Sequence, residues 1–280
     1  MFAFRASAPL VTRLATPHFV VQSANGAPWR QRLRSQLTSN LERAQVRLSR
    51  RVVSPTAVLA KEVAKAWGIR AESIAVVPTG IDPPRCAPST SDPVLGEAPY
   101  LLYFGRLEIR KGVDVLIDAL PAVLSAHPDV HCLFIGEDVG FRGRPFADYA
   151  REQCSEVWAR LHFLPRMPHA ELFRIVAGAT LVVIPSRWEN LANTCLESMV
   201  LARPIIATTG SGFDEVLSDG VDALLVPPGD AGALASAAEW LLGEPEELQR
   251  LGTAAQRTAE RFTVDGMARR LEEIYAGLGR

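Results

Sequence analysis

The sequence lacks long apolar runs, closely spaced cysteines and a sizeable net charge. No stretch of 18 apolar residues occurs among its 280 residues, so we expect no transmembrane helix. The opening segment is interrupted by Arg5 and Arg13, so we expect no signal peptide. The cysteines are Cys86, Cys132, Cys154 and Cys195. Because they are far apart and form no C-x-x-C pair, we expect free thiols in a reducing compartment, with no disulfide framework or zinc site. These absences predict a cytoplasmic protein.

Charge is distributed unevenly along the chain, although the net charge is only −1. Residues 1–51 contain nine arginines and one acidic residue, Glu42, for a net charge of +8. Residues 52–280 contain 21 basic and 30 acidic residues, for a net charge of −9. Such asymmetry indicates either an anionic partner on the basic side or a solvated helix face. The near-neutral total argues against a dedicated nucleic-acid-binding protein, which usually has a strongly basic domain.

From residue 99 onward, short apolar runs alternate with amphipathic segments. The apolar runs are 100–104, 130–135, 161–164, 180–184, 204–207 and 223–226. The segments with helical spacing are 113–126, 146–158, 169–177, 194–202 and 230–242. Short continuous apolar runs separated by helices are typical of a parallel sheet that is covered on both faces. Six such units predict an α/β domain with a doubly wound parallel sheet.

The first 82 residues follow a different pattern. We predict strands over 18–21, 51–53 and 73–77, and helices over 31–49 and 56–67, the second of which ends at Gly68. Residues 83–98 are rich in proline and have no periodicity, so we predict a linker. Two helices separated near Phe262 complete the chain over 245–278.

A loop with two glycines and several charges follows the predicted strand 100–104. It runs from Gly105 to Gly112 and leads into the predicted helix 113–126. Ligands of an open α/β sheet bind outside the carboxyl ends of its strands, and a helix N-terminus favours anions. Arg106 and Lys111 add positive charge, so the loop suits a diphosphate; solvated side chains at a helix start are the alternative. The sequence has neither a P-loop nor a G-x-G-x-x-G dinucleotide fingerprint.

A second polar loop follows the predicted strand 180–184 and carries two carboxylates. Glu189 and Glu197 are eight residues apart, which would place them about 80° apart on one continuous helix. If Glu189 lies on the loop and Glu197 in the first turn of a helix, both address one cleft. The structural alternative is a capping box, Thr194-x-x-Glu197, in which Glu197 satisfies backbone N–H groups. A third turn with glycines spans 208–216, and three such turns at successive strand ends would form one polar crevice.

The three turns together resemble a known enzyme family. Gly-Arg-x4-Lys-Gly from Gly105, Pro-Ser-x-x-Glu-x7-Glu-x-Met from Pro185 and Gly-x-Gly-x-x-Glu-Val from Gly210 are similar to motifs of the retaining nucleotide-sugar glycosyltransferases of the GT4 family. The resemblance implies the GT-B fold, in which two Rossmann-like lobes face each other. It also implies transfer of a sugar from a nucleoside diphosphate sugar, with retention of configuration, to an acceptor hydroxyl on a polysaccharide, a lipid-linked sugar or a small molecule.

The resemblance also implies roles for the motif residues. Arg106 and Lys111 would neutralise the donor diphosphate and Glu189 would contact the transferred sugar, which makes these three the catalytic candidates. Glu197 would accept hydrogen bonds from the ribose diol. The donor-binding residues would be Gly105, Arg106, Lys111, Glu189, Asn190, Leu191, Ala192, Asn193, Thr194 and Glu197. We expect no metal ion and no cofactor beyond the nucleotide sugar, since cationic side chains and a helix dipole take the metal's place and no D-x-D triplet occurs.

In the GT-B scheme the chain divides into four parts. Residues 1–82 would be a partial, acceptor-side N-terminal lobe, 83–98 a linker, 99–262 a complete nucleotide-sugar domain and 263–280 a helix that crosses back to the first lobe. His18 lies before the strand comparable to the one that carries a histidine in the family, and it is assigned no catalytic role. One alternative is a non-catalytic or partner-dependent nucleotide-sugar-binding subunit, whose cleft another chain completes. Another alternative is a related GT-B enzyme, such as a nucleotide-sugar epimerase.

The predicted helix 31–49 is basic and amphipathic. The arginines in and beside it are Arg30, Arg32, Arg34, Arg43, Arg47, Arg50 and Arg51, and the apolar positions between them are Leu33, Leu37, Leu41, Ala44 and Leu48. A basic amphipathic helix can lie on an anionic membrane, which would make the protein peripheral at the inner membrane face. The two alternatives are that the leucines pack on the N-terminal lobe and that they face a partner chain.

Overall fold

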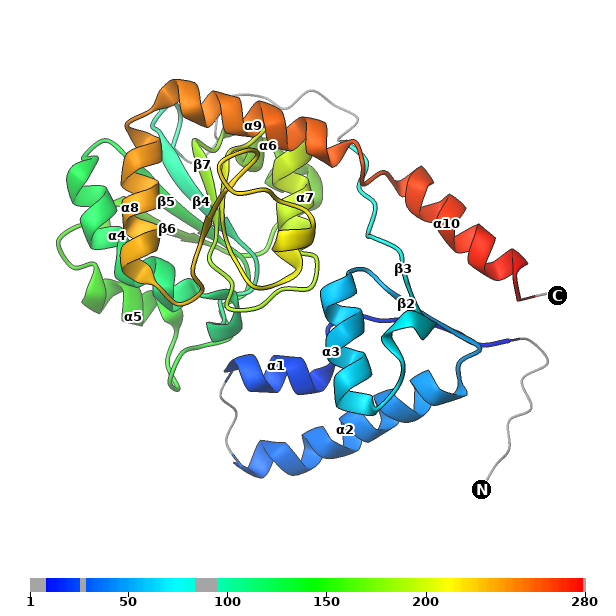
Figure 1. Cartoon of the computed structure of the whole chain (residues 1–280). Coiled ribbons are helices and arrows are strands. Elements are labelled where there is room, and N and C mark those ends of the chain that lie inside the picture. The colour runs from blue at the N-terminus through cyan, green and yellow to red at the C-terminus, as the bar shows by residue number, and fades with distance from the viewer. Residues whose placement is uncertain (1–8, 26–28, 84–94, 279–280) are drawn as a thin grey trace. The chain divides into compact units, whose positions relative to one another are not determined.

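The computed structural model describes residues 9–25, 29–83 and 95–278. The chain divides into two compact units (Figure 1). The larger unit runs from Ile81 to Arg261, and the smaller unit contains the described residues up to Gly80 together with those from Phe262 onward. Each unit has its own parallel β-sheet. Arg5, Cys86 and most of the predicted linker lie outside the described residues.

The larger unit is built on a six-stranded parallel sheet with the order β6-β5-β4-β7-β8-β9. Its strands are β4 (Tyr100–Phe104), β5 (His131–Ile135), β6 (Leu161–Leu164), β7 (Leu181–Ile184), β8 (Ile205–Thr208) and β9 (Leu224–Val226). Every residue of β4, β7 and β8 is buried, as continuous apolar runs require when both faces of a sheet are covered. The strand order is that of a doubly wound sheet, which confirms the predicted fold of this region.

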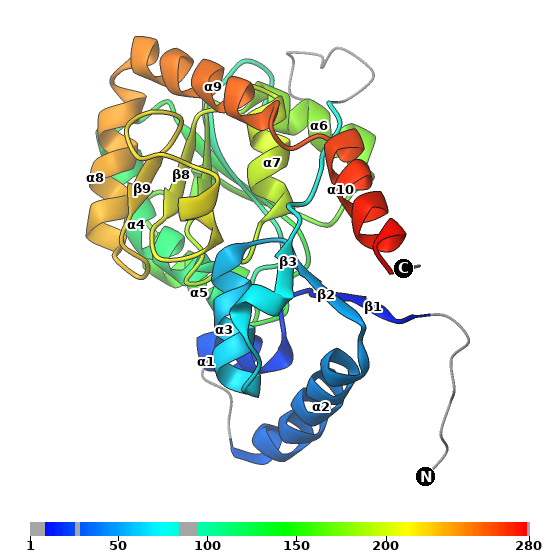
Figure 2. The ribbon, with the colours of Figure 1, turned by 45° about the vertical axis from the view of Figure 1, so that its right-hand side comes forward.

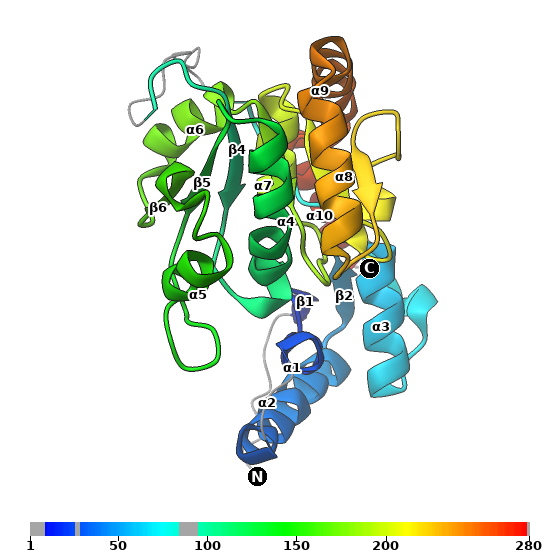
Figure 3. The same ribbon diagram turned by 90° about the vertical axis from the view of Figure 1, so that its left-hand side faces the viewer.

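Helices connect these strands and cover the sheet. They are α4 (Val113–Ala126), α5 (Phe146–Gln153), α6 (His169–Gly178), α7 (Asn193–Val200), α8 (Ala231–Leu242) and α9 (Pro245–Ala259), with the 3₁₀ turns η2 (Ile109–Lys111), η3 (Trp158–Arg160) and η4 (Gly212–Glu215). Helix α4 packs against α5 and lies side by side with α8 (Figure 3). Helix α7 packs against α6 and α9. The predicted helices of this region are therefore present. The one predicted over 146–158 ends at Gln153 and is followed by a turn and by η3, and the others differ by at most two residues at their ends.

Three cysteines of the larger unit are buried free thiols. They are Cys132 in β5, Cys154 at the end of α5 and Cys195 in α7. Burial raises the pKa of Cys132 and of Cys195, and it raises the pKa of Cys154 to about 12. Each therefore stays a neutral thiol near pH 7 and packs as a small apolar side chain.

The smaller unit has a three-stranded parallel sheet in the order β1-β2-β3 (Figure 2). Its elements are β1 (Val11–Arg13), α1 (His18–Asn25), α2 (Trp29–Leu48), β2 (Arg51–Ser54), α3 (Ala57–Trp67), the 3₁₀ turn η1 (Ala71–Ser73), β3 (Ile74–Val76) and α10 (Val264–Ala276). Helix α3 has clear end signals. The hydroxyl of Thr56 accepts the backbone N–H of Leu59 at 3.2 Å, and Gly68 adopts a left-handed φ of 65° after the last turn.

The strand predicted over 18–21 is wrong, because these residues form the first turn of α1. A short apolar run does not by itself distinguish a strand from a buried helical turn. The Glu42 carboxylate accepts the backbone N–H of His18 at 3.2 Å, which satisfies an amide at the helix start. Phe19 packs edge-on against Trp67, with ring centroids 5.8 Å apart. The strand that pairs with β2 is β1 instead.

Helix α2 presents a stripe of leucines to solvent. Leu37, Leu41 and Leu48 are 67%, 71% and 78% exposed. At about 100° per residue they lie within about 40° of one another, whereas Val46 lies roughly opposite and is buried. The alternative that these leucines pack on the lobe is therefore wrong at these positions.

None of the helices among the described residues has the length and hydropathy that crossing a bilayer requires. The side chains of Arg30, Arg32, Leu33 and Arg34 lie outside the described part of the structure.

Candidate active site

The carboxyl ends of β4 and β7 meet at the topological switch point of the six-stranded sheet. The chain leaves β4 toward β5 on one side and leaves β7 toward β8 on the other, so a crevice is expected between the two connections. The charged loop 105–112 follows β4, and the loop that carries Glu189 follows β7. The structure therefore brings these two turns together, and the third turn that the sequence singled out packs against the second.

Two glycines let these loops touch through their backbones. Gly112 has a left-handed φ of 68°, and a Cβ atom there would overlap the carbonyl oxygen of Pro185. A Cβ atom on Gly212, in the third turn, would overlap the carbonyl oxygen of Asn190. The backbone N–H of Gly212 also donates to the carbonyl oxygen of Glu189 at 2.9 Å. The absence of a side chain at these glycines thus allows the three turns to pack against one another.

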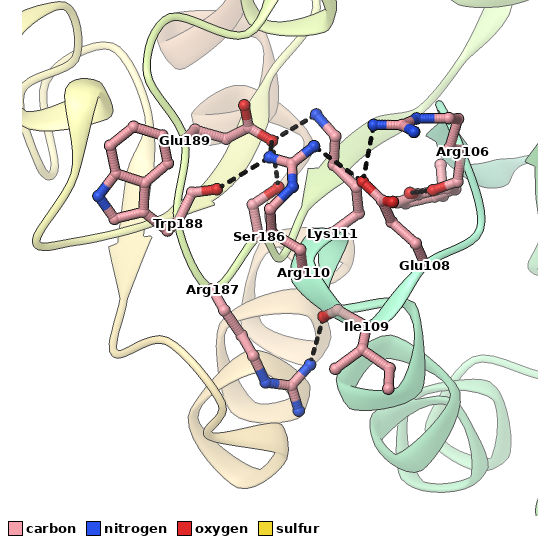
Figure 4. A network of polar contacts seen from close by, with 10 residues as sticks. Arg106, Glu108, Ile109, Arg110, Lys111, Ser186, Arg187, Trp188 and Glu189 are labelled. Carbon is pink, nitrogen blue, oxygen red and sulfur yellow. Dashed lines mark hydrogen bonds and ion pairs between the residues drawn. The ribbon is translucent and has the colours of Figure 1, made fainter. Parts of the chain in front are cut away.

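Glu189 is the centre of a buried network of charges (Figure 4). This residue is 4% exposed. Its Oε1 accepts from the Lys111 ammonium, from the Arg110 guanidinium at 3.3 Å and from the Ser186 hydroxyl at 3.2 Å. Within the described residues, none of these contacts goes to Oε2. Two cations and a hydroxyl offset the cost of burying the carboxylate, and one of its oxygens is left for a further donor.

Arg110 and Glu108 complete this network, and the sequence-based reasoning missed both. Arg110 is 4% exposed and donates to Glu108 at 2.8 Å and to the carbonyl oxygen of Trp188 at 3.3 Å. Arg106, with 54% of its side chain exposed, lies 3.1 Å from the same Glu108 oxygen. The contacts form a continuous chain from Arg106 to Glu189. The signal in the sequence is the density of charge, since four of the six residues from 106 to 111 are charged.

Two further side chains, Arg187 and Tyr103, hold these loops in place. Arg187 contacts both carboxylate oxygens of Asp114, at 2.6 and 2.8 Å. It also donates to the Ile109 carbonyl oxygen at 2.7 Å (Figure 4). Bidentate pairs of this kind restrict orientation as well as distance. The Tyr103 hydroxyl donates to the Arg106 carbonyl oxygen at 2.6 Å. Burial, with a smaller contribution from nearby carboxylates, raises the pKa of Tyr103, so this donor stays protonated.

Glu197 lies within α7 and does not cap it. The N-cap of α7 is Ala192, which makes no side-chain cap bond, and Thr194 lies inside the helix. The capping-box alternative is therefore wrong. Glu197 is 8% exposed, and its Oε1 lies 2.8 Å from Nε2 of His169. The first amides of the helix, including that of Asn193, have no carbonyl of their own helix to bind and can meet an anion.

A cavity of about 680 Å³ lies at the carboxyl ends of β4, β5 and β6. The predicted donor-site residues that line it are Gly105, Arg106, Asn193, Thr194 and Glu197. The predicted residues that do not line it are Lys111, Glu189, Asn190, Leu191 and Ala192. The other lining residues are Phe104, Ile135, Gly136, Glu137, Arg166, Met167, Pro168, His169 and Leu172. Most of these follow β5 and β6. The carboxyl ends of these strands are also places where ligands of an open α/β sheet bind.

Within the described residues, no group of three or more histidine, cysteine, aspartate or glutamate side chains is placed to hold a metal ion. The charges around the cavity and the switch point come instead from arginine, lysine and glutamate side chains. This arrangement can bind a ligand that carries both negative charge and hydroxyl groups.

Comparison with known proteins agrees with this chemistry. Residues 98–244, more than half of the chain, match the family described as "Glycosyl transferases group 1", and residues 1–85 match that described as "Glycosyltransferase Family 4". Glycogen synthase of Mycobacterium tuberculosis is 30% identical over 236 residues, which are 84% of this chain and 56% of that protein. The D-inositol 3-phosphate glycosyltransferase of Nocardia farcinica is 30% identical over 236 residues, which cover 81% of this chain and 52% of that protein.

Solved structures share the fold. Anabaena Alr3699/HepE in complex with UDP and glucose matches with a TM-score of 0.79 at 23% identity, over 96% of this chain and 72% of that one. Sucrose-phosphate synthase from Thermosynechococcus elongatus matches with a TM-score of 0.76 at 21% identity, over 96% and 67% of the two chains. These matches confirm the predicted GT-B fold class. The chain spans about half the length of the curated relatives it matches. Since a family match covers more than half of it, the chain belongs to the group 1 glycosyl transferases.

Proposed function

We propose that the protein transfers a sugar from a nucleoside diphosphate sugar to an acceptor hydroxyl, with retention of configuration at the anomeric carbon. The observation that carries the proposal is the cavity at the strand ends, in which cationic groups and the Glu197 carboxylate lie together. Its volume of about 680 Å³ suits a ligand the size of a nucleotide sugar. Membership of a glycosyl transferase family supports the same reaction.

Positive charge in the cavity supports a diphosphate-binding role. Arg106 and Arg166 enter it from the ends of β4 and β6, and the start of α7 adds unpaired amides and the positive end of a helix dipole. Glu197 lines the same cavity and can accept hydrogen bonds from the two hydroxyls of a ribose.

The switch point supports a role in holding the transferred sugar. Glu189 has one carboxylate oxygen free of the contacts that hold the other, so Oε2 can accept from a sugar hydroxyl. Lys111, which is paired to Glu189, has 18% of its side chain exposed and can reach toward a phosphate oxygen. We therefore assign Glu189, Arg106 and Lys111 to the catalytic machinery.

The reaction breaks the bond between the anomeric carbon and a diphosphate oxygen and forms a bond to the acceptor oxygen, whose proton is released. Negative charge grows on the departing diphosphate, and cations fixed in advance by a buried network lower the barrier without rearranging. Glu108 and Arg110 contribute by holding Arg106 and Glu189 in place.

Two measurements test this proposal. Calorimetric titration with UDP, ADP and GDP should detect binding of at least one of them. The corresponding α-linked glucose donor should then be consumed when hydroxyl acceptors are added, and the anomeric proton of the product, followed by NMR, should show the α configuration. Absence of binding for all three diphosphates at millimolar concentration would overturn the donor site, and a β-configured product would overturn retention.

A second proposal concerns α2, which we infer lies against an anionic membrane surface at the inner membrane face. Its exposed stripe of Leu37, Leu41 and Leu48 supplies apolar contact, and the exposed Arg47 lies beside it. Exposed arginines at 50 and 51 follow the end of the helix. Basic residues near an anionic surface contribute roughly 1 kcal/mol each, which adds to the burial of the leucines.

A further inference from the structure

His169 contacts the Glu197 carboxylate, which the proposed function assigns to the ribose. It is the first residue of α6, and its Nε2 lies 2.8 Å from Oε1 of Glu197. The imidazole is 61% exposed, whereas the Glu197 side chain is only 11% exposed. The ring packs edge-on against Phe173, with centroids 4.4 Å apart and an interplanar angle of 63°. Both members of the pair line the cavity of about 680 Å³.

Because of its contact with His169, the Glu197 carboxylate already has a hydrogen-bond partner when a ligand arrives. A ribose diol donates two hydrogen bonds to a carboxylate, so it must share or replace the hydrogen bond from the imidazole. Histidine is the side chain that changes charge near neutral pH. A charged imidazole holds the carboxylate by a charge-assisted bond, which is stronger than the bond that a neutral imidazole donates.

We propose that His169 is a positioning residue for Glu197, and that its protonation state determines how strongly the pocket holds the ribose of the donor. The inference rests on the proposed function, because it needs a nucleotide in this cavity. When His169 is charged, the ribose hydroxyls compete with an ion pair for Oε1. When His169 is neutral, its hydrogen bond to Glu197 is weaker and is broken more readily, so that Glu197 accepts from the diol.

Other charges around the imidazole act on the phosphates as well as on His169. Those that line the cavity with it are Arg106, Glu137, Arg166 and Glu197, and Glu171 and Arg174 follow on α6. A charged His169 also attracts the diphosphate, which opposes the effect on the ribose. A ribonucleoside diphosphate and its 2′-deoxy counterpart carry the same phosphates, so the ratio of their affinities isolates the diol from these charges.

The experiment measures that ratio between about pH 5.5 and about pH 8. Calorimetry is carried out on the whole chain with whichever of UDP, ADP and GDP binds, and with its 2′-deoxy form. In the wild type, the preference for the ribonucleotide should rise about fivefold with pH, which is the difference expected between a charged and a neutral hydrogen bond. In His169→Gln, which keeps an N–H donor that does not titrate, the ratio should not change with pH. His18→Gln, which removes an imidazole from the smaller unit, should behave as the wild type.

The possible outcomes distinguish failure of the role of His169 from failure of the donor site. A ratio that is independent of pH in the wild type, or that rises equally in His169→Gln, would overturn the role of His169 and leave the proposed function intact. If neither wild type nor variant binds any of the diphosphates, the donor site itself is wrong, and this inference fails with it.

Discussion

The charged side chains around Glu189 in the larger unit are mostly buried and paired, whereas Arg47 of α2 in the smaller unit is exposed. Arg110 is 4% exposed and contacts two carboxylates, while Arg47 is exposed beside leucines that are at least 67% exposed. Breaking a buried pair leaves an uncompensated charge and is strongly destabilising, but exposed groups contribute little to folding. A substitution in the first region therefore reports on stability and ligand binding, and one in the second reports on contact with other molecules.

The largest effect is expected from Glu189→Gln. This change keeps the shape of the side chain but leaves Arg110 and Lys111 facing a neutral amide, so the free energy of unfolding should fall by about 3 kcal/mol. Urea denaturation followed by circular dichroism measures it. Glu197→Gln is the matched control, because its carboxylate has a largely exposed partner. Equal stability of Glu189→Gln and the wild type would show that burial of these charges does not stabilise the fold.

Lys111→Ala should weaken the binding of a nucleoside diphosphate about thirtyfold, the effect of losing one charge-assisted contact to phosphate. Calorimetric titration gives the affinity. Lys61→Ala, which removes an exposed lysine from α3, should bind as the wild type does. If Lys111→Ala retains full affinity, the lysine serves only to neutralise Glu189.

Glu197→Gln should lower the affinity for the same diphosphate about tenfold while changing the free energy of unfolding by less than about 1 kcal/mol. An amide is a weaker acceptor for the diol, but its oxygen can still accept from His169, so the fold loses little. Calorimetry and thermal melting are compared on one preparation. A variant that melts much earlier and binds normally would assign Glu197 a purely structural role.

The smallest effect on the fold is expected from Leu41→Gln in α2. Stability should change by less than about 0.5 kcal/mol, because the side chain is exposed. Sedimentation with vesicles should show that the wild type binds anionic lipid at low salt and is released at high salt, and that Leu41→Gln binds more weakly. Leu10→Gln, also in the smaller unit, should leave vesicle binding unchanged. Equal recovery of the wild type with neutral and anionic vesicles would remove the membrane proposal.

The larger sheet could be predicted from the sequence because its strands are continuous apolar runs bounded by helices. The run at His18–Val21 was misassigned because four residues do not reveal their period, and the hydrogen bond from the His18 amide to Glu42, far along the chain, has no signature in the local sequence. The stripe of leucines on α2 was also visible in the sequence. The sequence did not show which side of α2 packs against the rest of the smaller unit. A helical pattern gives the angle between residues but not the position of the neighbouring elements.

The site was predictable where it depends on strand ends and not where it depends on contacts between loops. Arg106 lies two residues after the end of β4, and Lys111 lies on the loop that this strand leads into, which marks both as ligand-facing candidates. Arg110 reaches Glu189 across 79 positions of sequence, and His169 reaches Glu197 across 28. No local pattern encodes such pairs, because they arise from the order of strands in the sheet.

The buried thiols of the larger unit make it possible to observe local unfolding by chemistry. A neutral, buried thiol barely reacts with an alkylating reagent, because the thiolate is the nucleophile and the reagent must also reach it. The rate of modification at Cys195 would then measure how often α7 opens, and the rate at Cys132 how often β5 does. Since Cys195 lies two residues before Glu197, a nucleotide bound at the start of α7 should protect it more than it protects Cys132.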